Sequence, residues 1–215
     1  MAPKTTNSVI DLPPLNIQRI DVSIVGDSPL ISHAWSKKAK EQMLAKQMKK
    51  AATGKAAKDP WLDFCESLYW LDGMPDYPTE QDVLNGRFGF PSIAFKAAAI
   101  TAVTTIGSLT KVMARQCFHV MGEHIQILGG APAQREDMAR VGMGTADIRF
   151  RGEFSPWAAI LPIQFNANAL SAEQVVNLIH AGGFGVGVGD WRPEKDGVYG
   201  RFHVASAEEM KGFVK

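Results

Sequence analysis

The stretch from residue 182 to residue 202 carries the residue types best suited to holding a ligand. Seven glycines fall within its first nineteen residues, with aromatic and basic side chains among and after them. Glycine lets the backbone adopt positive φ and approach a ligand closely, so such runs often hold phosphates. Aromatic rings stack on bases, and basic side chains supply positive charge. The candidate binding residues here are Trp191, Arg192, Lys195, Tyr199, Arg201 and Phe202.

The same glycines also have a structural interpretation, as a flexible surface loop that leads into an edge strand. The pattern differs from the dinucleotide-binding and P-loop fingerprints, because it follows a predicted helix rather than a strand. In addition, no Gly-Lys-Ser/Thr sequence closes it. The glycines alone therefore leave both interpretations open.

A second candidate is the segment from residue 36 to residue 59, in which lysines dominate the charge. Up to Lys58 they are opposed only by Glu41, and Ala, Gln and Met fill most other positions. This composition favours a helix with a weak apolar face, which is typical of a solvated helix or a mobile insertion. The functional alternative is a basic arm that meets phosphates. Its candidate binding residues are Lys37, Lys38, Lys46, Lys49 and Lys50.

A third candidate lies at the start of a helix predicted over residues 92–106. Ser92 is a suitable N-cap, since its hydroxyl can accept a hydrogen bond from the first turn. Lys96 falls in that turn, where a positive charge opposes the helix dipole. An anion resting on the helix N-terminus would suit such a lysine. Ser92 and Lys96 are therefore candidate binding residues.

Catalytic motifs are not prominent in this sequence. It contains no Gly-x-Ser-x-Gly elbow, no HExxH and no paired-carboxylate motif. His119 and His124 are predicted to be structural. Asp27 follows the first predicted strand and is expected to accept backbone hydrogen bonds in a turn. We therefore expect no catalytic residues, no metal and no other cofactor.

The composition describes a globular chain with enough apolar surface for a core. Of its 215 residues 46% are hydrophobic, and the formal net charge of +1 says little about partners. Cys65 and Cys117 match no zinc spacing and are expected to be buried, reduced thiols, which suits a cytoplasmic protein. Residues 1–15 lack the apolar core of a signal peptide, and no apolar run approaches the length of a membrane span. No membrane partner is expected.

Hydrophobic patterning and capping signals predict the order of the elements. In chain order they are strand 17–25, helix 92–106, a short helix from Leu109, one or two strands within 117–128, strand 146–154, strand 158–165, a helix from Ser171 and strand 199–204. Strands 146–154 and 158–165 are expected to pair around Ser155-Pro156. Ser171 and Gln174 form a capping box, and Gly182 or Gly183 is expected to end that helix.

This order predicts the α+β class, with a ferredoxin-like or RRM-like βαββαβ core and long insertions. Residues 1–16 are expected to be an extended tail, and residues 17–215 a single RRM-like domain. A lysine-rich helical insertion is placed at about 36–72. A projecting loop is placed at about 129–144, with Arg135 and Arg140 on it.

Three separated stretches carry a family resemblance. They are Gly26-Asp27-Ser28-Pro29-Leu30, the segment from Phe90 to Ala98, and the capped helix with the glycine-rich stretch after it. Together they resemble the RAMP superfamily, and most of all the repeated backbone subunit of CRISPR effector complexes. That family typically reads Pro-x-Ser-Ser-Leu-Lys-Gly at its first helix, which Pro91, Ser92 and Lys96 match. Ala97 stands where glycine is usual, and Tyr199-Gly200-Arg201 matches the family's second motif. The likeness touches about half the chain.

The resemblance implies that the protein binds single-stranded RNA or DNA on an RRM-like core. It also implies that copies of the chain assemble side by side along the strand, with other effector subunits as further partners. In the family the first-helix lysine touches phosphate, and a thumb projects between the bases. By position the thumb here is residues 129–144, with Arg135 and Arg140 as contacts. Some relatives cleave RNA with a metal-dependent aspartate, and Asp27 stands at that place.

Two departures from the family pattern leave alternatives open. The chain is shorter than most such subunits, and its lysine-rich insertion is unfamiliar. A phage or plasmid protein that coats or anneals single-stranded DNA on the same fold fits as well. Another alternative is an assembly protein whose glycine-rich stretch contacts another subunit. The residues do not distinguish RNA from DNA, because no pattern reports on a 2′-hydroxyl.

Overall fold

The computed structural model describes residues 13–49, 57–107, 109–141 and 145–214. Its strands are β1 (Ile17–Gly26), β2 (Leu30–Ser32), β3 (Tyr69–Trp70), β4 (Phe88–Pro91), β5 (Phe118–Val120), β6 (His124–Gly129), β7 (Ala133–Val141), β8 (Thr145–Phe154), β9 (Trp157–Asn166) and β10 (Phe202–Val204). Its helices are α1 (Lys37–Gln47), α2 (Pro60–Glu66), α3 (Glu80–Asn85), α4 (Ser92–Ile106), α5 (Lys111–Cys117), α6 (Ala172–Gly185) and α7 (Ala207–Met210). The predicted α+β class is confirmed.

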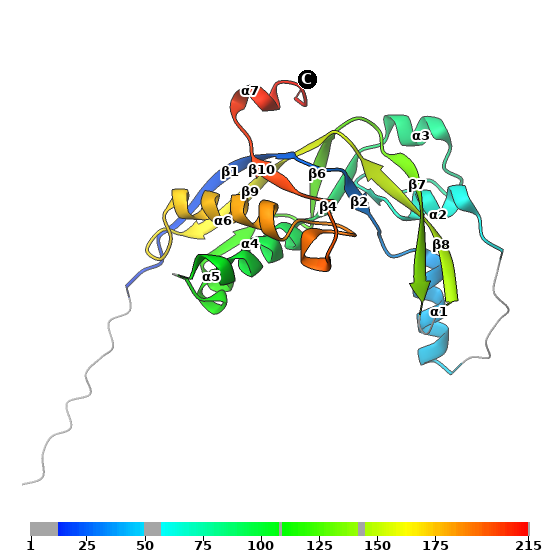
Figure 1. The fold of residues 1–215 in the computed structure, drawn as a ribbon, viewed down its shortest axis with the longest axis horizontal. Coiled ribbons are helices and arrows are strands. Elements are labelled where there is room, and N and C mark those ends of the chain that lie inside the picture. Colours follow the sequence, from blue (N-terminus) through cyan, green and yellow to red (C-terminus); the bar gives the residue numbers. More distant parts are fainter. Residues whose placement is uncertain (1–12, 50–56, 108, 142–144, 215) are drawn as a thin grey trace, which may run out of the picture.

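The central sheet has the strand order β10-β1-β9-β6-β4-β3, and β5 also pairs with β9 (Figure 1). Its pairs are antiparallel, and β1 pairs with β9 along nearly its whole length, with Ile20 opposite Ile163. Alternation along β1 turns Val22 and Ile24 into the core, because successive side chains of a strand point to opposite faces. Within this sheet the neighbours β10, β1, β9 and β6 come from both ends and the middle of the chain.

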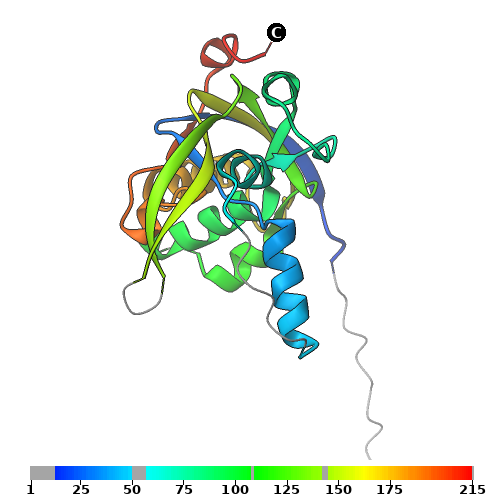
Figure 2. The same ribbon diagram turned by 90° about the vertical axis from the view of Figure 1, so that its right-hand side faces the viewer.

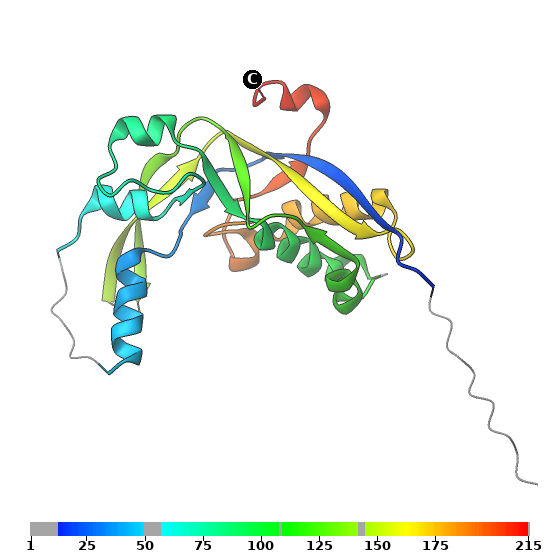
Figure 3. The ribbon, with the colours of Figure 1, turned by 180° about the vertical axis from the view of Figure 1, so that it is seen from behind.

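Helices α4 and α6 pack against each other on one face of the central sheet (Figures 1 and 3). Gly182 permits this approach, because a Cβ there would lie 2.7 Å from the backbone nitrogen of Ala99. Gly183 meets β10 in the same way, since its Cβ would lie 2.1 Å from the carbonyl oxygen of Phe202. The helix therefore continues through both glycines to Gly185, and the prediction that either glycine ends it is wrong.

The predicted start of α6 and the predicted thiols agree with the structure. Ser171 accepts a hydrogen bond from the Gln174 backbone at 3.2 Å, and the Gln174 side chain accepts one from the Ser171 backbone at 2.9 Å. This is the capping box. Cys65 and Cys117 are buried free thiols. Burial raises the pKa of Cys65 to about 11, so this thiol stays protonated and unreactive at neutral pH.

Strands β7 and β8 form a hairpin that pairs with β2 in a separate three-stranded sheet (Figure 2). The prediction that strand 146–154 pairs with strand 158–165 is therefore wrong, since β8 pairs with β7 and β2 while β9 pairs with β1, β5 and β6. Alternating residues identify a strand but not its partner. The element placed at 129–144 extends as a hairpin over 133–154, and residues 142–144 lie outside the described residues.

The chain between β1 and α4 forms a long insertion that carries β2, α1, α2, β3, α3 and β4. The predicted lysine-rich helix is confirmed as α1, which begins after Ser36 because the Ser36 hydroxyl accepts a hydrogen bond from the Ala39 backbone at 3.1 Å. Residues 72–90 contain α3 and most of β4. Among the described residues, no helix is both long enough and apolar enough to cross a membrane.

Candidate nucleic-acid interface

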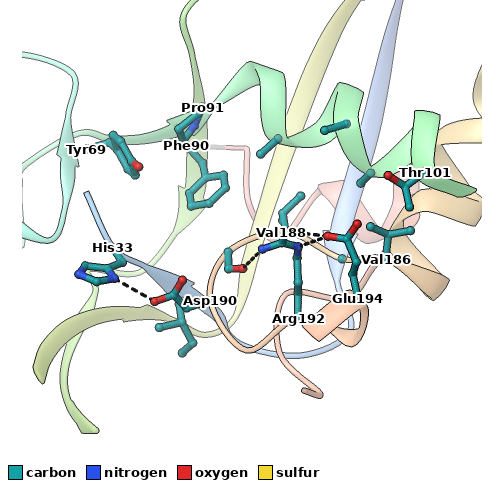
Figure 4. Close-up of a pocket in the computed structure, with 16 residues that line it drawn as sticks. His33, Tyr69, Phe90, Pro91, Thr101, Val186, Val188, Asp190, Arg192 and Glu194 are labelled. Carbon is teal, nitrogen blue, oxygen red and sulfur yellow. Dashed lines mark hydrogen bonds and ion pairs between the residues drawn. The ribbon is translucent and has the colours of Figure 1, made fainter. Parts of the chain in front are cut away.

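A hollow of about 270 Å³ lies between α4, the end of β4 and the glycine loop, which we define as residues 186–201 (Figure 4). The wall from α4 consists of small side chains, namely Ala94, Ala97, Ala98 and Thr101. The loop forms the opposite wall with Val186, Gly187, Val188, Gly189, Asp190, Arg192 and Glu194. The hollow therefore joins the first-helix motif to the glycine loop, two stretches that are far apart in the sequence.

Arg192 is the cation of this hollow. Figure 4 shows its guanidinium held between Glu194 and the loop backbone. Nε lies 3.0 Å from a carboxylate oxygen of Glu194, and Nη1 donates to the carbonyl of Gly189 at 3.1 Å. Tyr69, Phe90 and Pro91 add an apolar rim at one end. The hollow thus offers one fixed cation, two carboxylates, two glycines and flat apolar surface.

Hydrogen bonds to Pro29 and Ile31, at β2, hold the glycine loop in one conformation. The Asp190 nitrogen donates to the carbonyl of Ile31 at 3.1 Å, and the Gly200 nitrogen donates to that of Pro29 at 2.8 Å. Gly200 has φ +66°, and a Cβ there would lie 1.7 Å from the carbonyl oxygen of Val188. Only glycine fits that position. The chain itself therefore fixes which loop atoms face the hollow.

Asp190 is the centre of an ion-pair network that the sequence did not reveal. Its carboxylate lies 3.0 Å from His33 Nδ1 and 3.1 Å from Arg151 Nη2. The Arg151 side chain is only 4% exposed, also pairs with Asp137 at 3.2 Å, and its Nε has no hydrogen-bond partner among the described residues. Burial raises the pKa of Asp190, but His33 and Arg151 lower it more, so its pKa lies below the usual range. The network ties the loop to β8 and to the residue after β2.

Arg135, predicted as a thumb contact, is engaged within the chain. Its Nη1 lies 2.8 Å from Glu153, its Nε lies 2.8 Å from Asp137, and its guanidinium lies over the Tyr199 ring at 4.6 Å from the centroid. Burial lowers the pKa of Arg135, and its hydrogen-bonded partners raise it more, so the pKa is above the usual value. Arg135 and Tyr199 join the hairpin to the glycine loop. That they contact a nucleic-acid strand stays a prediction.

The remaining loop candidates differ in exposure. Trp191 is exposed, and the Arg151 guanidinium lies over its ring at 5.9 Å from the centroid. Lys195 is exposed and Arg201 is half-buried. Phe202 is 1% exposed and packs edge-on against the rings of Phe95 and Trp157. Phe202 therefore belongs to the core and offers no ring face to a base in this structure.

Ser92 is buried beside the turn between β5 and β6. Its hydroxyl donates to the carbonyl of Gly122, and its backbone nitrogen donates to that of Glu123. Pro91 is the cap residue of α4, and no side chain caps this helix. The prediction that Ser92 is the N-cap is therefore wrong, because its side chain fastens the helix start to the β5–β6 turn instead.

Lys96 lies on the side of α4 turned away from the hollow. At about 100° per residue, it stands about 200° around the helix from Ala94. Its Nζ donates to the carbonyl of Arg115 at 2.9 Å, near the C-terminal end of α5, and lies 3.0 Å from His119 Nδ1. Burial lowers the pKa of Lys96; burial, followed by the charge of Lys96, lowers that of His119. The structure does not bring Lys96 together with the glycine loop.

The lysine-rich helix reaches the surroundings of the hollow. Lys37 and Lys40 line a second hollow of about 420 Å³ together with Tyr69, which also lines the first hollow. Lys46 and Lys49 lie further along the same segment and are exposed. Of the other candidates, Lys38 belongs to α1 and Arg140 to β7, while Lys50 lies outside the described residues.

Asp27 pairs with His203, which stands between two carboxylates. Asp27 Oδ1 lies 2.6 Å from His203 Nδ1, and Glu209 Oε1 lies 3.0 Å from Nε2. Because carboxylates only accept hydrogen bonds, this geometry favours the doubly protonated ring. Burial lowers the pKa of His203, and the two carboxylates raise it more, so the net shift is upward. In the described part of the chain, no group of three or more His, Cys, Asp or Glu side chains is arranged to hold a metal ion.

No protein-family model matches this chain, and no curated protein matches it. Among solved structures, the chain is similar to Cmr6 from Pyrococcus furiosus, with a TM-score of 0.44 and 9% sequence identity. The similarity covers 88% of this chain and 98% of that one. A likeness this distant says nothing about what the chain binds.

Proposed function

We propose that this protein binds a single-stranded nucleic acid through the hollow between α4 and the glycine loop. The observation that carries the proposal is the meeting of two separate motifs there: the start of α4 from Pro91 onward, and the loop that precedes Tyr199-Gly200-Arg201. Both motifs were singled out by their resemblance to the RAMP superfamily. The segment from Phe90 to Ala98 and the glycine loop thus line one hollow, although Ser92, Lys96 and Tyr199-Gly200-Arg201 are not part of its lining.

The chemistry of the hollow suits a flexible strand. The small side chains on the α4 wall and the glycines Gly187 and Gly189 on the loop wall leave room for a sugar–phosphate chain to approach closely. Arg192 supplies one cation, which Glu194 balances, so a phosphate would bind there by replacing the Glu194 carboxylate on the guanidinium. The two carboxylates of the lining are engaged within the chain, Glu194 by Arg192 and Asp190 by His33 and Arg151, and are not free to read base edges. Binding is therefore expected to show little sequence preference.

The arrangement of the core supports the wider proposal. Along the chain the order is β1, α4, β5–β6, β9, α6 and β10, and in the sheet the neighbours are β10-β1-β9-β6. We read this as a ferredoxin-like core, on which the long insertion and the hairpin are mounted. On this basis the protein acts by binding rather than catalysis, as a subunit that assembles side by side with copies of itself on RNA or DNA, like the backbone subunit of a CRISPR effector complex.

The decisive experiment places a carboxylate in the hollow without removing any hydrogen bond. Ala97→Glu does this, since Ala97 is exposed on α4 and glutamate is a good helix former. Ile93→Glu is the matched control, because Ile93 is 72% exposed on the same helix but does not line the hollow. Affinity for fluorescein-labelled RNA and DNA 12-mers, single-stranded and duplex, is measured by anisotropy at several salt concentrations.

The expected result is binding of single strands by the unsubstituted chain, with affinity that falls as salt rises by a slope of about −0.7 per phosphate neutralised. Ala97→Glu should weaken this binding at least tenfold while Ile93→Glu leaves it within about twofold. If the unsubstituted chain binds no single strand at low salt, the proposal fails. If both variants bind equally well, the strand does not lie in this hollow.

A further inference from the structure

Trp35 is an exposed aromatic residue that the sequence analysis did not single out. It is 61% exposed, although it lies only three residues after the end of the buried strand β2. It lines two hollows at once: one of about 420 Å³ with Lys37 and Lys40, and one of about 430 Å³ with Lys58 and Arg149. Trp35 therefore lines two hollows, each with basic and acidic groups on its walls.

Hydrogen bonds hold the backbone on both sides of Trp35. The Ala34 nitrogen donates to the carbonyl of Ser67 at 2.8 Å, which ties the chain before Trp35 to the end of α2. Directly after it, the Ser36 hydroxyl caps α1 through its 3.1 Å contact with the Ala39 nitrogen. Because the backbone is already held, a partner that stacks on the ring has to order only the two side-chain torsions of Trp35.

Each hollow beside Trp35 shares a lining residue with the hollow at the glycine loop. His33 lines the loop hollow and the Lys58 hollow, and Tyr69 lines the loop hollow and the Lys37 hollow. A nucleic-acid strand that leaves the glycine loop past either residue meets a hollow that Trp35 lines. Its surroundings there are basic along α1, where residues 37–47 contain four lysines and one glutamate. This charge suits a polyanion.

We infer that Trp35 stacks on a base of the bound strand where the strand passes from the glycine loop towards α1. The inference rests on the proposed function. It adds a specific contact and a path that the nucleic-acid strand takes from the glycine loop towards α1. The ring recognises a base rather than a phosphate. The hollow that contains Lys58 is also lined by Asp63 and Asp147, so its wall is of mixed charge and does not select a phosphate. Every base has a flat π-face, so stacking here does not depend on sequence.

The test compares Trp35→Ala and Trp35→Phe on an ordinary single-stranded 12-mer and on an abasic 12-mer that keeps the sugar–phosphate chain. Trp35→Ala should weaken binding of the ordinary strand by about 5-fold to about 140-fold, the range for one base–aromatic stack. It should leave binding of the abasic strand unchanged. Trp35→Phe should restore most of the affinity. Tyr77→Ala is the matched control, since Tyr77 is 91% exposed and lines none of these hollows.

A second measurement keeps the test valid if Trp35→Ala folds poorly. Strand binding should quench tryptophan fluorescence of the unsubstituted chain, and Trp35→Phe should lose that part of the quench while still binding. The inference is overturned if Trp35→Ala binds the ordinary strand as well as the unsubstituted chain does, or if it loses affinity equally for the abasic strand. It is also overturned if Trp35→Ala changes only the oligomeric state without a strand, because a second copy then covers the ring. If Ala97→Glu blocks binding and Trp35→Ala does not affect it, only this inference fails. If the unsubstituted chain binds no strand, both fail.

Discussion

Replacing Lys96 by methionine separates a structural role of this lysine from the phosphate contact that its motif suggests. Lys96→Met keeps most of the aliphatic stem and removes the charge and all three donors. In the structure the ammonium donates to the carbonyl of Arg115 and lies 3.0 Å from His119 Nδ1. The substitution therefore leaves a carbonyl near the end of α5 without its side-chain donor.

The expected cost follows from that geometry. A hydrogen bond from a charged donor contributes about 1.5–3 kcal/mol, and because Lys96 is only half-buried we take about 1–2 kcal/mol. In a domain of this size, 1 kcal/mol lowers the melting temperature by about 2–4 °C, so the expected fall is about 2–8 °C. The salt dependence of strand binding should not change, because Lys96 stands on the far side of α4 from the hollow.

The assay is thermal unfolding followed by circular dichroism, paired with anisotropy at several salt concentrations. Lys46→Met is the control, since Lys46 is exposed in the last turn of α1 and its loss should change stability little. An unchanged melting temperature together with a salt slope reduced by about 0.7 would refute the structural role, because it would mean that Lys96 neutralises one phosphate of the nucleic-acid strand.

Two further predictions concern the glycine loop and His203 in β10. Gly200→Ala should destabilise the chain by at least about 1–3 kcal/mol, measured by urea unfolding, because φ is +66° and the new Cβ would overlap the carbonyl oxygen of Val188. Gly185→Ala, with open space around its Cβ, should be neutral or stabilising, and equal effects of the two would contradict the packing argument. His203→Gln should remove a pH-dependent contribution, since a raised folded-state pKa stabilises fully below the unfolded value of about 6.5 and is lost as pH rises through the folded value. The stability difference between the unsubstituted chain and this variant should be larger at pH 5.5 than at pH 8.5, and a difference that grows with pH would contradict it.

Two helix features that depend only on local sequence were predicted correctly. The capping box of Ser171 and Gln174 needs only residues three apart, so the sequence contains all of its atoms. The same holds for α1, whose composition favours a helix whatever it packs against. The failure at Ser92 has the opposite cause, because its hydroxyl finds the carbonyl of Gly122, thirty residues away, before it can cap its own helix.

Pairing between distant segments could not be predicted from the sequence. Strand β8 alternates charged and apolar residues, which indicates a strand with one wet face. In the structure Asp137 of β7 and Asp190 of the glycine loop both pair with Arg151, which is buried although it lies on that face. Nothing local distinguishes Arg151 from Arg149, which stays partly exposed on the same side of the strand. Only the packed chain identifies it.

The glycines that first drew attention to the loop turn out to have several different tasks. Gly182 and Gly183 lie within α6 and let it touch α4 and β10, while Gly200 lets the loop fold back on Val188. Only Gly187 and Gly189 line the hollow, and both have positive φ. A high density of glycine is therefore not in itself the sign of a ligand site. In this chain most of these glycines permit close packing. The hollow beside α4 forms where that packing holds the glycine loop against β2.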